Sequence, residues 1–208
     1  MRNILPASLV LLLVACATPM PTLEFTPGDI TPVSKKLDAD LRSITVSVAL
    51  EQERLGETQV GLSGNFYEQG FKASLKTALE EGLARSAVFD DLSRRKISLS
   101  AKVMKFQSPL GGAHFNTDMI TRYELIDRGS GKTIFWHDIS STGSVPGTYA
   151  FSGATRFTEA RNRAVRENVK AFVAALEQYG LDDEASARGT YLLKRSEKLP
   201  AKPIRPAH

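Results

Sequence analysis

Residues 116–142 read NTDMITRYELIDRGSGKTIFWHDISST, and this stretch decides the fold. Large apolar side chains alternate with polar ones on both sides of residues 128–131, a period of two that predicts half-buried β-strands. Gly129 and Gly131 predict a tight turn between them, because glycine adopts positive φ angles without steric cost. We therefore predict a hairpin of two antiparallel strands, over residues 116–127 and 132–142.

Two more strands are predicted before the hairpin. Residues 42–50 alternate β-branched and aliphatic side chains with small polar ones. Residues 97–103 repeat the pattern, and the apolar positions then shift by one at Met104. Such a shift indicates a β-bulge, in which one extra residue turns the strand's side chains to the other face.

Two amphipathic helices complete the predicted elements. Over residues 65–86 apolar side chains recur every four positions, which places them on one helix face. Residues 158–179 carry a second apolar stripe, with Arg161 expected on its solvent-facing side. Gly180 is predicted to end this helix in a left-handed conformation.

The predicted order is strand, helix, three strands, helix. Two helices with apolar stripes need a sheet to cover, so the sequence predicts an α+β fold, a two-layer sandwich of about four mainly antiparallel strands and two helices. The domain is expected over residues 41–181, a length sufficient for one hydrophobic core.

The amino-terminal stretch predicts an export signal. A basic start precedes an apolar run over residues 4–14, which is too short to span a bilayer. The run ends in Leu13-Val14-Ala15-Cys16, which resembles a bacterial lipobox. The resemblance implies a signal peptide over residues 1–15, a diacylglyceryl thioether on Cys16 and acylation of the new amino terminus, for example with palmitate. The alternatives are an ordinary secretory peptide cleaved elsewhere and an uncleaved anchor.

Two terminal segments flank the predicted domain. Frequent prolines over residues 16–40 predict an extended tether between the membrane and the domain. Residues 182–208 are basic and proline-containing, and are predicted to form a disordered tail that binds anionic lipid or polymer or only aids solubility. Ala17 stands where an Asp retains many lipoproteins at the inner membrane, which by analogy predicts the outer membrane, facing the periplasm.

The charge distribution argues against nucleic-acid binding. The chain has a net charge of +4, of which Arg2 contributes +1 and residues 185–208 contribute +5. Subtraction, 4 − 1 − 5, leaves −2 for residues 16–184, so the predicted domain is not basic. Cys16 is the single cysteine, so no disulfide is expected within the chain.

No convergent catalytic set is recognisable in the sequence. The three histidines are not at metal-ligand spacing, and neither a metal nor a cofactor is expected. His137 and Asp138 are adjacent, and adjacent strand residues point to opposite faces. Residues 129–132 lack the strand-to-helix context of a phosphate-binding loop. We therefore predict a protein that is not an enzyme.

Two glycine-rich loops suggest a binding surface. Residues 110–116 contain Phe115, and residues 144–155 contain Tyr149 and Phe151. Exposed aromatic side chains on adaptable loops are typical of interfaces, and we predict that these three residues bind a partner. The alternative is that the rings pack back onto the sheet.

Residues 71–89 and 123–136 carry a resemblance to a known group of proteins. The first segment is a helix ending in a small residue before Val88-Phe89, and the second is a hairpin of the form D-x-x-x-G-K-x-x-x-W. Together they resemble envelope lipoproteins whose small α/β domain is akin to the amino-terminal domain of TolB and to the CsgG and LpoB domains. The resemblance implies an adaptor in an envelope assembly, and it implies no active site.

The sequence thus favours a non-catalytic outer-membrane lipoprotein that serves as a periplasmic adaptor in envelope biogenesis or transport. It would bind the membrane through Cys16 and an envelope protein through its sheet edge or its aromatic loops. One alternative is a carrier of lipid or glycan that holds its ligand between sheet and helices. A less favoured alternative is a hydrolase that uses His137.

Overall fold

The computed structural model describes residues 23–60, 65–108 and 114–197. Cys16 and the start of the predicted tether lie outside these residues. The elements follow in the predicted order, with one short 3₁₀ helix added: β1 Asp40–Val48, η1 Glu51–Glu53, α1 Asn65–Ser86, β2 Lys96–Gln107, β3 His114–Asp127, β4 Thr133–Pro146 and α2 Gly153–Glu197.

The four strands form one open sheet in the order β1-β2-β3-β4. Strands β1 and β2 are parallel, because α1 carries the chain back across the sheet between them. The pairs β2–β3 and β3–β4 are antiparallel, and β3–β4 is the predicted hairpin. The register of β2 against β3 shifts between Val103 and Lys105, which confirms the bulge predicted at Met104.

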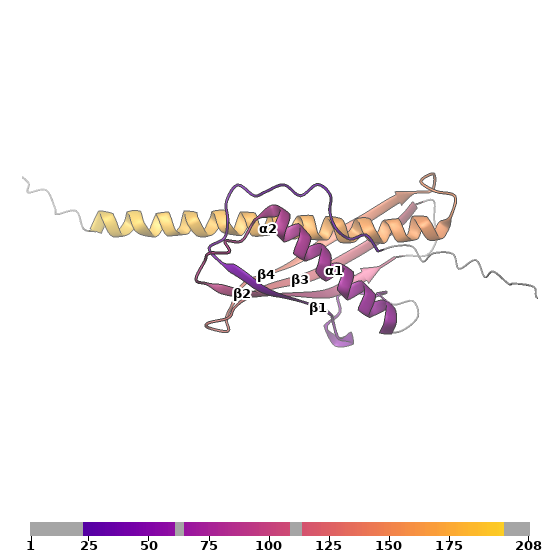
Figure 1. Ribbon diagram of the computed structural model, residues 1–208, viewed down its shortest axis with the longest axis horizontal. Helices are drawn as coiled ribbons and strands as arrows, with labels where there is room; N and C mark the ends of the chain where they lie inside the picture. The colour runs from indigo at the N-terminus through magenta and orange to yellow at the C-terminus, as the bar shows by residue number, and fades with distance from the viewer. Residues whose placement is uncertain (1–22, 61–64, 109–113, 198–208) are drawn as a thin grey trace, which may run out of the picture.

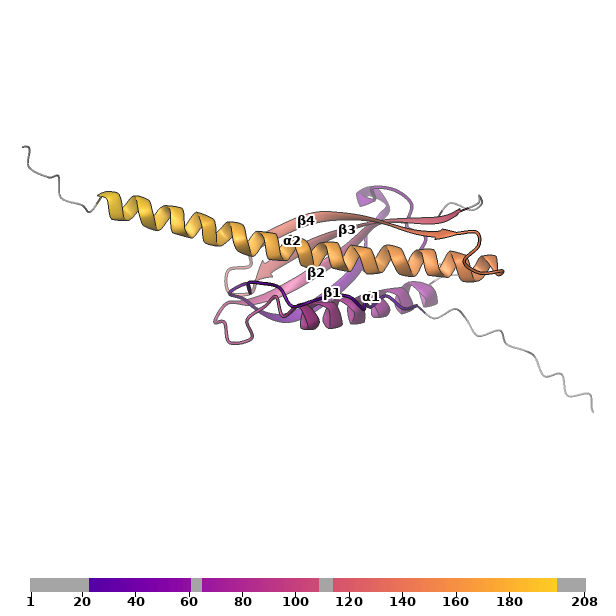
Figure 2. The ribbon, with the colours of Figure 1, turned by 90° about the horizontal axis from the view of Figure 1, so that it is seen from above.

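Both helices lie on the same face of the sheet, so the molecule has two layers (Figures 1 and 2). The predicted α+β sandwich is confirmed. The stripe of α1 is buried against β1, and its Phe71 ring also contacts that of Phe106 on β2, 4.8 Å away. Helix α2 packs over β3 and β4. The space between the layers is filled by fully buried side chains, among them Leu75, Leu79, Tyr123 and Phe172.

The other face of the sheet carries mainly polar side chains. Ser43 on β1 donates to Ser98 on β2, at 2.9 Å between the hydroxyl oxygens. Arg122 on β3 forms a two-pronged ion pair with Asp138 on β4, at 2.7 and 2.8 Å. Cross-strand pairs of this kind let a sheet face meet water.

Residues 23–39 form a strap that is packed on the domain, which corrects the prediction of a free tether reaching residue 40. Phe25 is buried, with its ring 5.2 Å from that of Phe71 in an edge-on contact. Further along, the Val33 N–H donates to the Ser86 carbonyl at 2.8 Å. The strap runs along α2, above it in Figure 1. Of its few large apolar residues, Phe25 and Leu37 are buried in the core, and Leu23, Ile30 and Val33 pack against the core while partly exposed. The prediction considered the prolines of this segment and not these contacts.

Helix α2 is longer than predicted, with 45 residues. The prediction that it ends at Gly180 is wrong, and so is the prediction of disorder for residues 182–197. Gly180 continues the helix, and the space beside it is filled by Leu37, 2.9 Å from the position of an added Cβ. Residues 181–197 are rich in helix formers, and the next proline is Pro200. Within the described residues, no helix is long and apolar enough to cross a membrane.

Candidate functional site: an aromatic tip and an edge groove

The three aromatic residues predicted to bind a partner lie together at one end of the molecule. Phe115 is paired with Val145 across β3 and β4, and Tyr149 and Phe151 belong to the connection from β4 to α2. Phe151 is fully exposed, and 47% of Tyr149 is exposed. We call Phe115 together with residues 147–152 the aromatic tip. The rings of Tyr149 and Phe151 are therefore not packed back onto the sheet.

Arg156 in the first turn of α2 holds the tip in shape. Its guanidinium donates to the carbonyls of Gly147 and Phe151, at 3.1 and 3.3 Å, and also to that of Ala150. The same group lies over the Phe115 ring, 5.0 Å from its centre. One arginine thus satisfies several loop carbonyls and stacks on an aromatic ring, an arrangement that suits its planar, multidentate head group.

Arg163, two turns further along α2, supports the same loop. It donates to the Ser144 carbonyl at 2.9 Å and to the Glu159 carboxylate at 2.8 Å. Its guanidinium lies 5.2 Å from the centre of the Tyr149 ring. Because both arginines are anchored on a helix, the tip is a preformed surface.

Gly143 lets α2 lie directly on β4 next to the tip. A Cβ at this position would stand 2.0 Å from the Ala160 carbonyl oxygen and 2.3 Å from the Ala164 nitrogen. These distances are far below van der Waals contact, so only glycine allows the two backbones to approach this closely. The small side chains of the two alanines contribute to the same approach.

A buried hydrogen-bond network fixes α2 to the hairpin one turn further on. The Tyr123 hydroxyl donates to the Asn168 side-chain carbonyl at 2.8 Å, and the Asn168 amide donates to the Ile139 carbonyl at 2.9 Å. The Tyr123 ring stacks on Phe172 with 3.9 Å between ring centres. Burial raises the pKa of Tyr123, so the hydroxyl keeps its proton and remains a donor.

Arg161 is buried, which corrects its predicted place on the solvent side of α2. It donates to the Gln59 carbonyl at 2.6 Å, and its guanidinium lies 4.5 Å from the centre of the Phe106 ring. Burial lowers the pKa of Arg161 to about 10, because the charged form is less well solvated there. Side-chain periodicity placed Arg161 on the helix face that points away from the apolar stripe. It could not show that the chain after β1 covers Arg161 there.

A groove of about 510 Å³ runs along β4 on the side away from β3. It is lined by residues 133–137 of β4 and by Ala175, Gln178 and Tyr179 of α2. The Tyr179 hydroxyl closes one part of it by donating to the Ile134 carbonyl at 3.0 Å. Among the described residues no strand pairs with this side of β4, so the groove follows a free sheet edge.

Trp136 is the most exposed aromatic residue of the groove, with 62% of its surface accessible. The Arg122 guanidinium lies 5.6 Å from the centre of its ring and is itself paired with Asp138. The alternation of residues 132–142 predicted Trp136 only as a residue of the hairpin, and not as part of a binding surface. The alternation of side chains could have indicated it, because Trp136 is a large apolar residue at a position of the last strand that faces solvent.

His137 and Asp138 point to opposite faces of the sheet, as predicted. His137 lies in the groove, with its ring 6.3 Å from that of Phe135. Asp138 lies on the outer face, where hydrogen bonding from Arg122 holds its pKa below the ordinary value. The two residues therefore do not form an acid–base pair. In the described ranges, no three His, Cys, Asp or Glu side chains come together as a metal site.

Comparisons with known proteins give likenesses of fold. No protein-family model matches the chain, and no curated protein sequence matches it. Protein XCC0632 of Xanthomonas campestris, of the DUF330 family, is similar, with 14% identity over 79% of this chain and 97% of that one, and a TM-score of 0.48.

Two lipoproteins are also similar in structure. A minor lipoprotein of Acinetobacter baumannii has 12% identity over 66% of this chain and 91% of its own, with a TM-score of 0.39. Lipoprotein GNA1162 of Neisseria meningitidis has 16% identity over 65% and 98%, with a TM-score of 0.26. At such low identities and scores, these likenesses carry no argument about this chain's role. The grouping with TolB, CsgG and LpoB domains stays a prediction.

Proposed function

We propose that this chain is an outer-membrane lipoprotein whose folded domain faces the periplasm and acts as a non-catalytic adaptor for an envelope protein. The observation that carries the proposal is the Leu13–Cys16 ending, seven residues before the packed strap begins at Leu23. Acyl chains on Cys16 would supply about 0.8 kcal/mol of membrane binding for each buried CH₂ group.

The edge groove is the surface to which we assign the partner. A free edge strand offers unpaired backbone groups to an incoming extended segment. The aromatic lining, with Trp136 and Phe135 on β4 and Tyr179 on α2, offers apolar contact beside that edge. Aromatic side chains at the centre of a contact contribute most of the binding energy in many interfaces. The expected occupant is therefore an extended segment of an envelope protein with apolar side chains.

A carrier of lipid or glycan is less well supported. That hypothesis places the ligand between sheet and helices, where Leu79, Tyr123 and Phe172 leave the described core filled. The groove has a volume in the range of ligand pockets, but it is open and lies at the sheet edge, between β4 and α2. The hydrolase hypothesis rests on His137, which lies apart from Asp138.

The lipid anchor is tested with Cys16→Ser. Cells that express the natural chain and the variant are labelled with palmitate, and their membranes are washed at high pH. The proposal expects label and membrane retention for the natural chain and loss of both for the variant. Equal labelling and equal retention of the two chains would refute lipidation at Cys16.

Partner docking is tested by placing a photo-crosslinking amino acid at position 136 in intact cells. The matched control carries it at position 92, because Leu92 is also an exposed apolar residue, with 92% of its surface accessible, and is not among the residues that line the groove. We expect a discrete cross-linked envelope protein from position 136 and none from position 92. Identical products from both positions would exclude the groove as the docking surface.

A further inference from the structure

We propose that the aromatic tip inserts into the interface of the same membrane that holds Cys16, so that the domain stands on the bilayer tip first. The proposal rests on the lipid anchor of the proposed function and is independent of which protein occupies the edge groove. It assigns the predicted binding residues Phe115, Tyr149 and Phe151 to a lipid surface.

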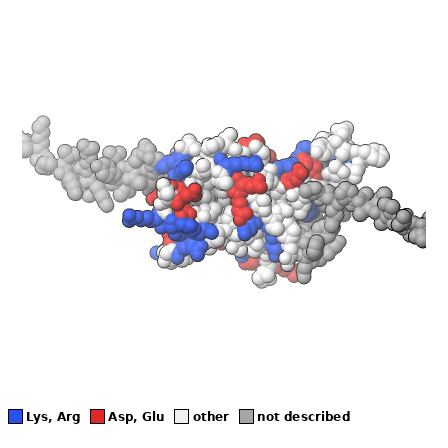
Figure 3. Space-filling view, viewed as in Figure 1, with Lys and Arg blue, Asp and Glu red and all other residues white. Residues whose placement is uncertain are grey.

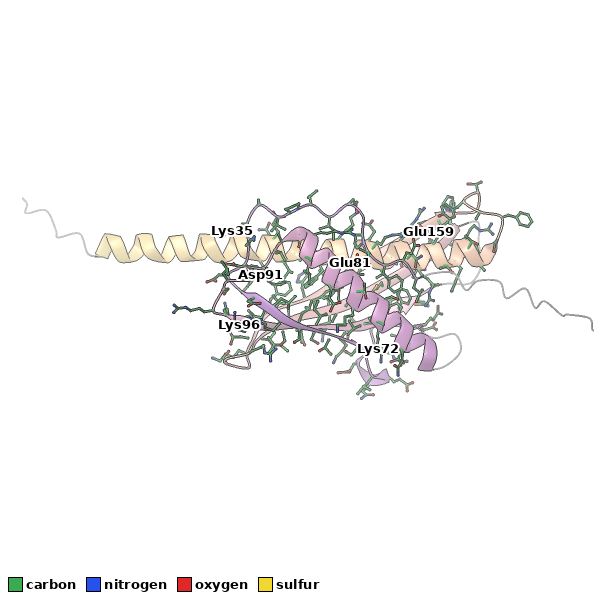
Figure 4. All side chains as sticks on the ribbon, in the orientation of Figure 1. Lys35, Lys72, Glu81, Asp91, Lys96 and Glu159 are labelled. Carbon is green, nitrogen blue, oxygen red and sulfur yellow. The ribbon has the colours of Figure 1, made fainter. Side chains whose placement is uncertain are left out.

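The course of the strap gives the first argument. The strap runs alongside α2 and in the same direction. Near its start Arg166 donates to the Glu24 carbonyl at 3.2 Å, in the middle Lys170 pairs with Asp29 at 2.8 Å, and near its end Ser34 bonds Glu177. Followed back toward residue 23, the chain therefore heads for the end where α2 begins and the tip lies. Figure 4 shows the same arrangement, with Lys35 toward one end and Glu159 toward the other.

The lengths are compatible with this placement. Arg166, which contacts Glu24, lies 13 residues after the start of α2 at Gly153, which is about 20 Å along the helix axis. The seven residue steps from Cys16 to Leu23 reach at most about 25 Å. The lipidated residue can therefore lie level with the tip, but it cannot reach much further. A short link of this kind keeps this end of the domain close to the bilayer surface.

The composition of the tip gives the second argument. No Asp, Glu, Lys or Arg occurs over residues 139–155, and the end of the molecule where α2 begins is largely white in Figure 3. Behind this charge-free segment, α2 carries three partly exposed arginines, Arg156, Arg163 and Arg166, whereas Arg161 is buried. The one acidic residue over 153–166, Glu159, pairs with Arg163 and Arg166. Aromatic and aliphatic groups in front of basic ones match the layers of a membrane interface, where rings lie at head-group depth and cations meet lipid phosphates.

The shape of the tip gives the third argument. Phe151 is fully exposed, yet its loop is fixed through the contacts of Arg156 with three carbonyls. A fixed loop loses little conformational entropy when its ring leaves water. The opposite end, around Asp91 and Lys96, presents charged side chains, as Figures 3 and 4 show. The tip thus exposes apolar rings and the opposite end exposes charges, and only apolar groups gain free energy by entering the membrane interface.

The test uses the full-length lipidated chain with one added cysteine. Because Cys16 is the only natural cysteine and its thiol is consumed by the thioether, Phe151→Cys and Leu92→Cys each give a single site for an environment-sensitive fluorophore. The fluorophore at position 151 replaces one aromatic ring with another, and Leu92 is the exposed apolar control at the far end. Both proteins are reconstituted into vesicles of phosphatidylethanolamine and phosphatidylglycerol, and palmitate incorporation is measured on the same samples.

We expect iodide in the water to quench the label at 151 roughly threefold less than the label at 92, because the tip is withdrawn into the interface. Lipids with a nitroxide near the head group should quench position 151 and spare position 92. Equal quenching of the two positions by both agents would overturn the proposal. Protection of position 151 in intact cells but not in vesicles would also overturn it, because a protein would then cover the tip.

The palmitate measurement distinguishes failure of the tip proposal from failure of the proposed lipid anchor on Cys16. If both variants carry palmitate and position 151 is as accessible as position 92, the tip proposal fails while the lipoprotein proposal stands. If neither variant carries palmitate, the proposed anchor fails, and the tip proposal fails with it.

Discussion

The contact of α2 with β4 at Gly143 predicts that adding one methyl group there strongly destabilises the protein. In Gly143→Ala the new Cβ would stand 2.0 Å from the Ala160 carbonyl oxygen, whereas ordinary contact begins at 3.4 Å. The helix must therefore move away by about 1.4 Å (3.4 − 2.0). This movement also stretches the hydrogen bonds of Asn168 to Ile139 and of Ser141 to Ala164.

The expected cost follows from these two effects. Overpacking of a rigid contact costs about 1–3 kcal/mol, and each of the two strained hydrogen bonds adds about 1 kcal/mol. The free energy of unfolding should therefore fall by about 3–5 kcal/mol. For a domain of this size the melting temperature then falls by roughly 10 °C, at about 2–4 °C per kcal/mol.

The assay is thermal and urea unfolding followed by circular dichroism, with Gly70→Ala as the matched control. Gly70 is exposed in α1, and nothing lies within 4 Å of its added Cβ. The same substitution should there stabilise the protein by about 0.5–1 kcal/mol, through better helix propensity and lower chain entropy. A Gly143→Ala protein that melts within about 2 °C of the natural chain would refute the close approach of α2 and β4.

Three further predictions concern the core, the hairpin turn and the strap. Tyr123→Phe should lower the free energy of unfolding by about 1–3 kcal/mol in urea titrations, because Asn168 loses its buried donor. Hydrogen bonds, first from the Ser130 N–H, lower the pKa of Asp127 to about 2, so its contribution to stability is complete above about pH 4 and is lost as the pH falls toward 2. Melting curves of Asp127→Asn should lie below those of the natural chain at pH 6 and converge with them near pH 2. Phe25→Ala should cost about 3 kcal/mol and expose the strap to limited proteolysis.

Side-chain periodicity predicted the elements of the domain well, because most of them bury one face. Helix α1 has the predicted bounds, and the hairpin turn and the bulge at Met104 lie where the pattern placed them. Such features depend on neighbours in the sequence. The extension of α2 beyond Gly180 was missed because a glycine usually marks a helix end, and here Leu37 of the distant strap fills the space beside it.

The candidate site was only partly predictable. The sequence singled out Phe115, Tyr149 and Phe151 as exposed loop aromatics, and the structure brings them to one end. It did not predict that Arg156 and Arg163 would hold their loop. A cation–π contact, or a hydrogen bond to the carbonyl of another segment, produces no repeating pattern of residues in the sequence. The groove beside Trp136 was missed for a similar reason, since it arises from the position of β4 at the sheet edge.

The packing of the strap changes what the lipid anchor can do. A free tether over residues 16–40 could hold the domain up to about 80 Å from the bilayer, at which distance the orientation of the domain would be unconstrained. Because the strap is packed from Leu23, only seven residue steps separate Cys16 from the packed chain, and these can span at most about 25 Å. The buried contact of Phe25 with Phe71 therefore shortens the chain length between the lipid anchor and the packed domain. Loss of that contact should increase the accessibility of the tip to iodide without changing the acylation of Cys16, so the strap, rather than the lipid alone, would determine how the domain meets the membrane.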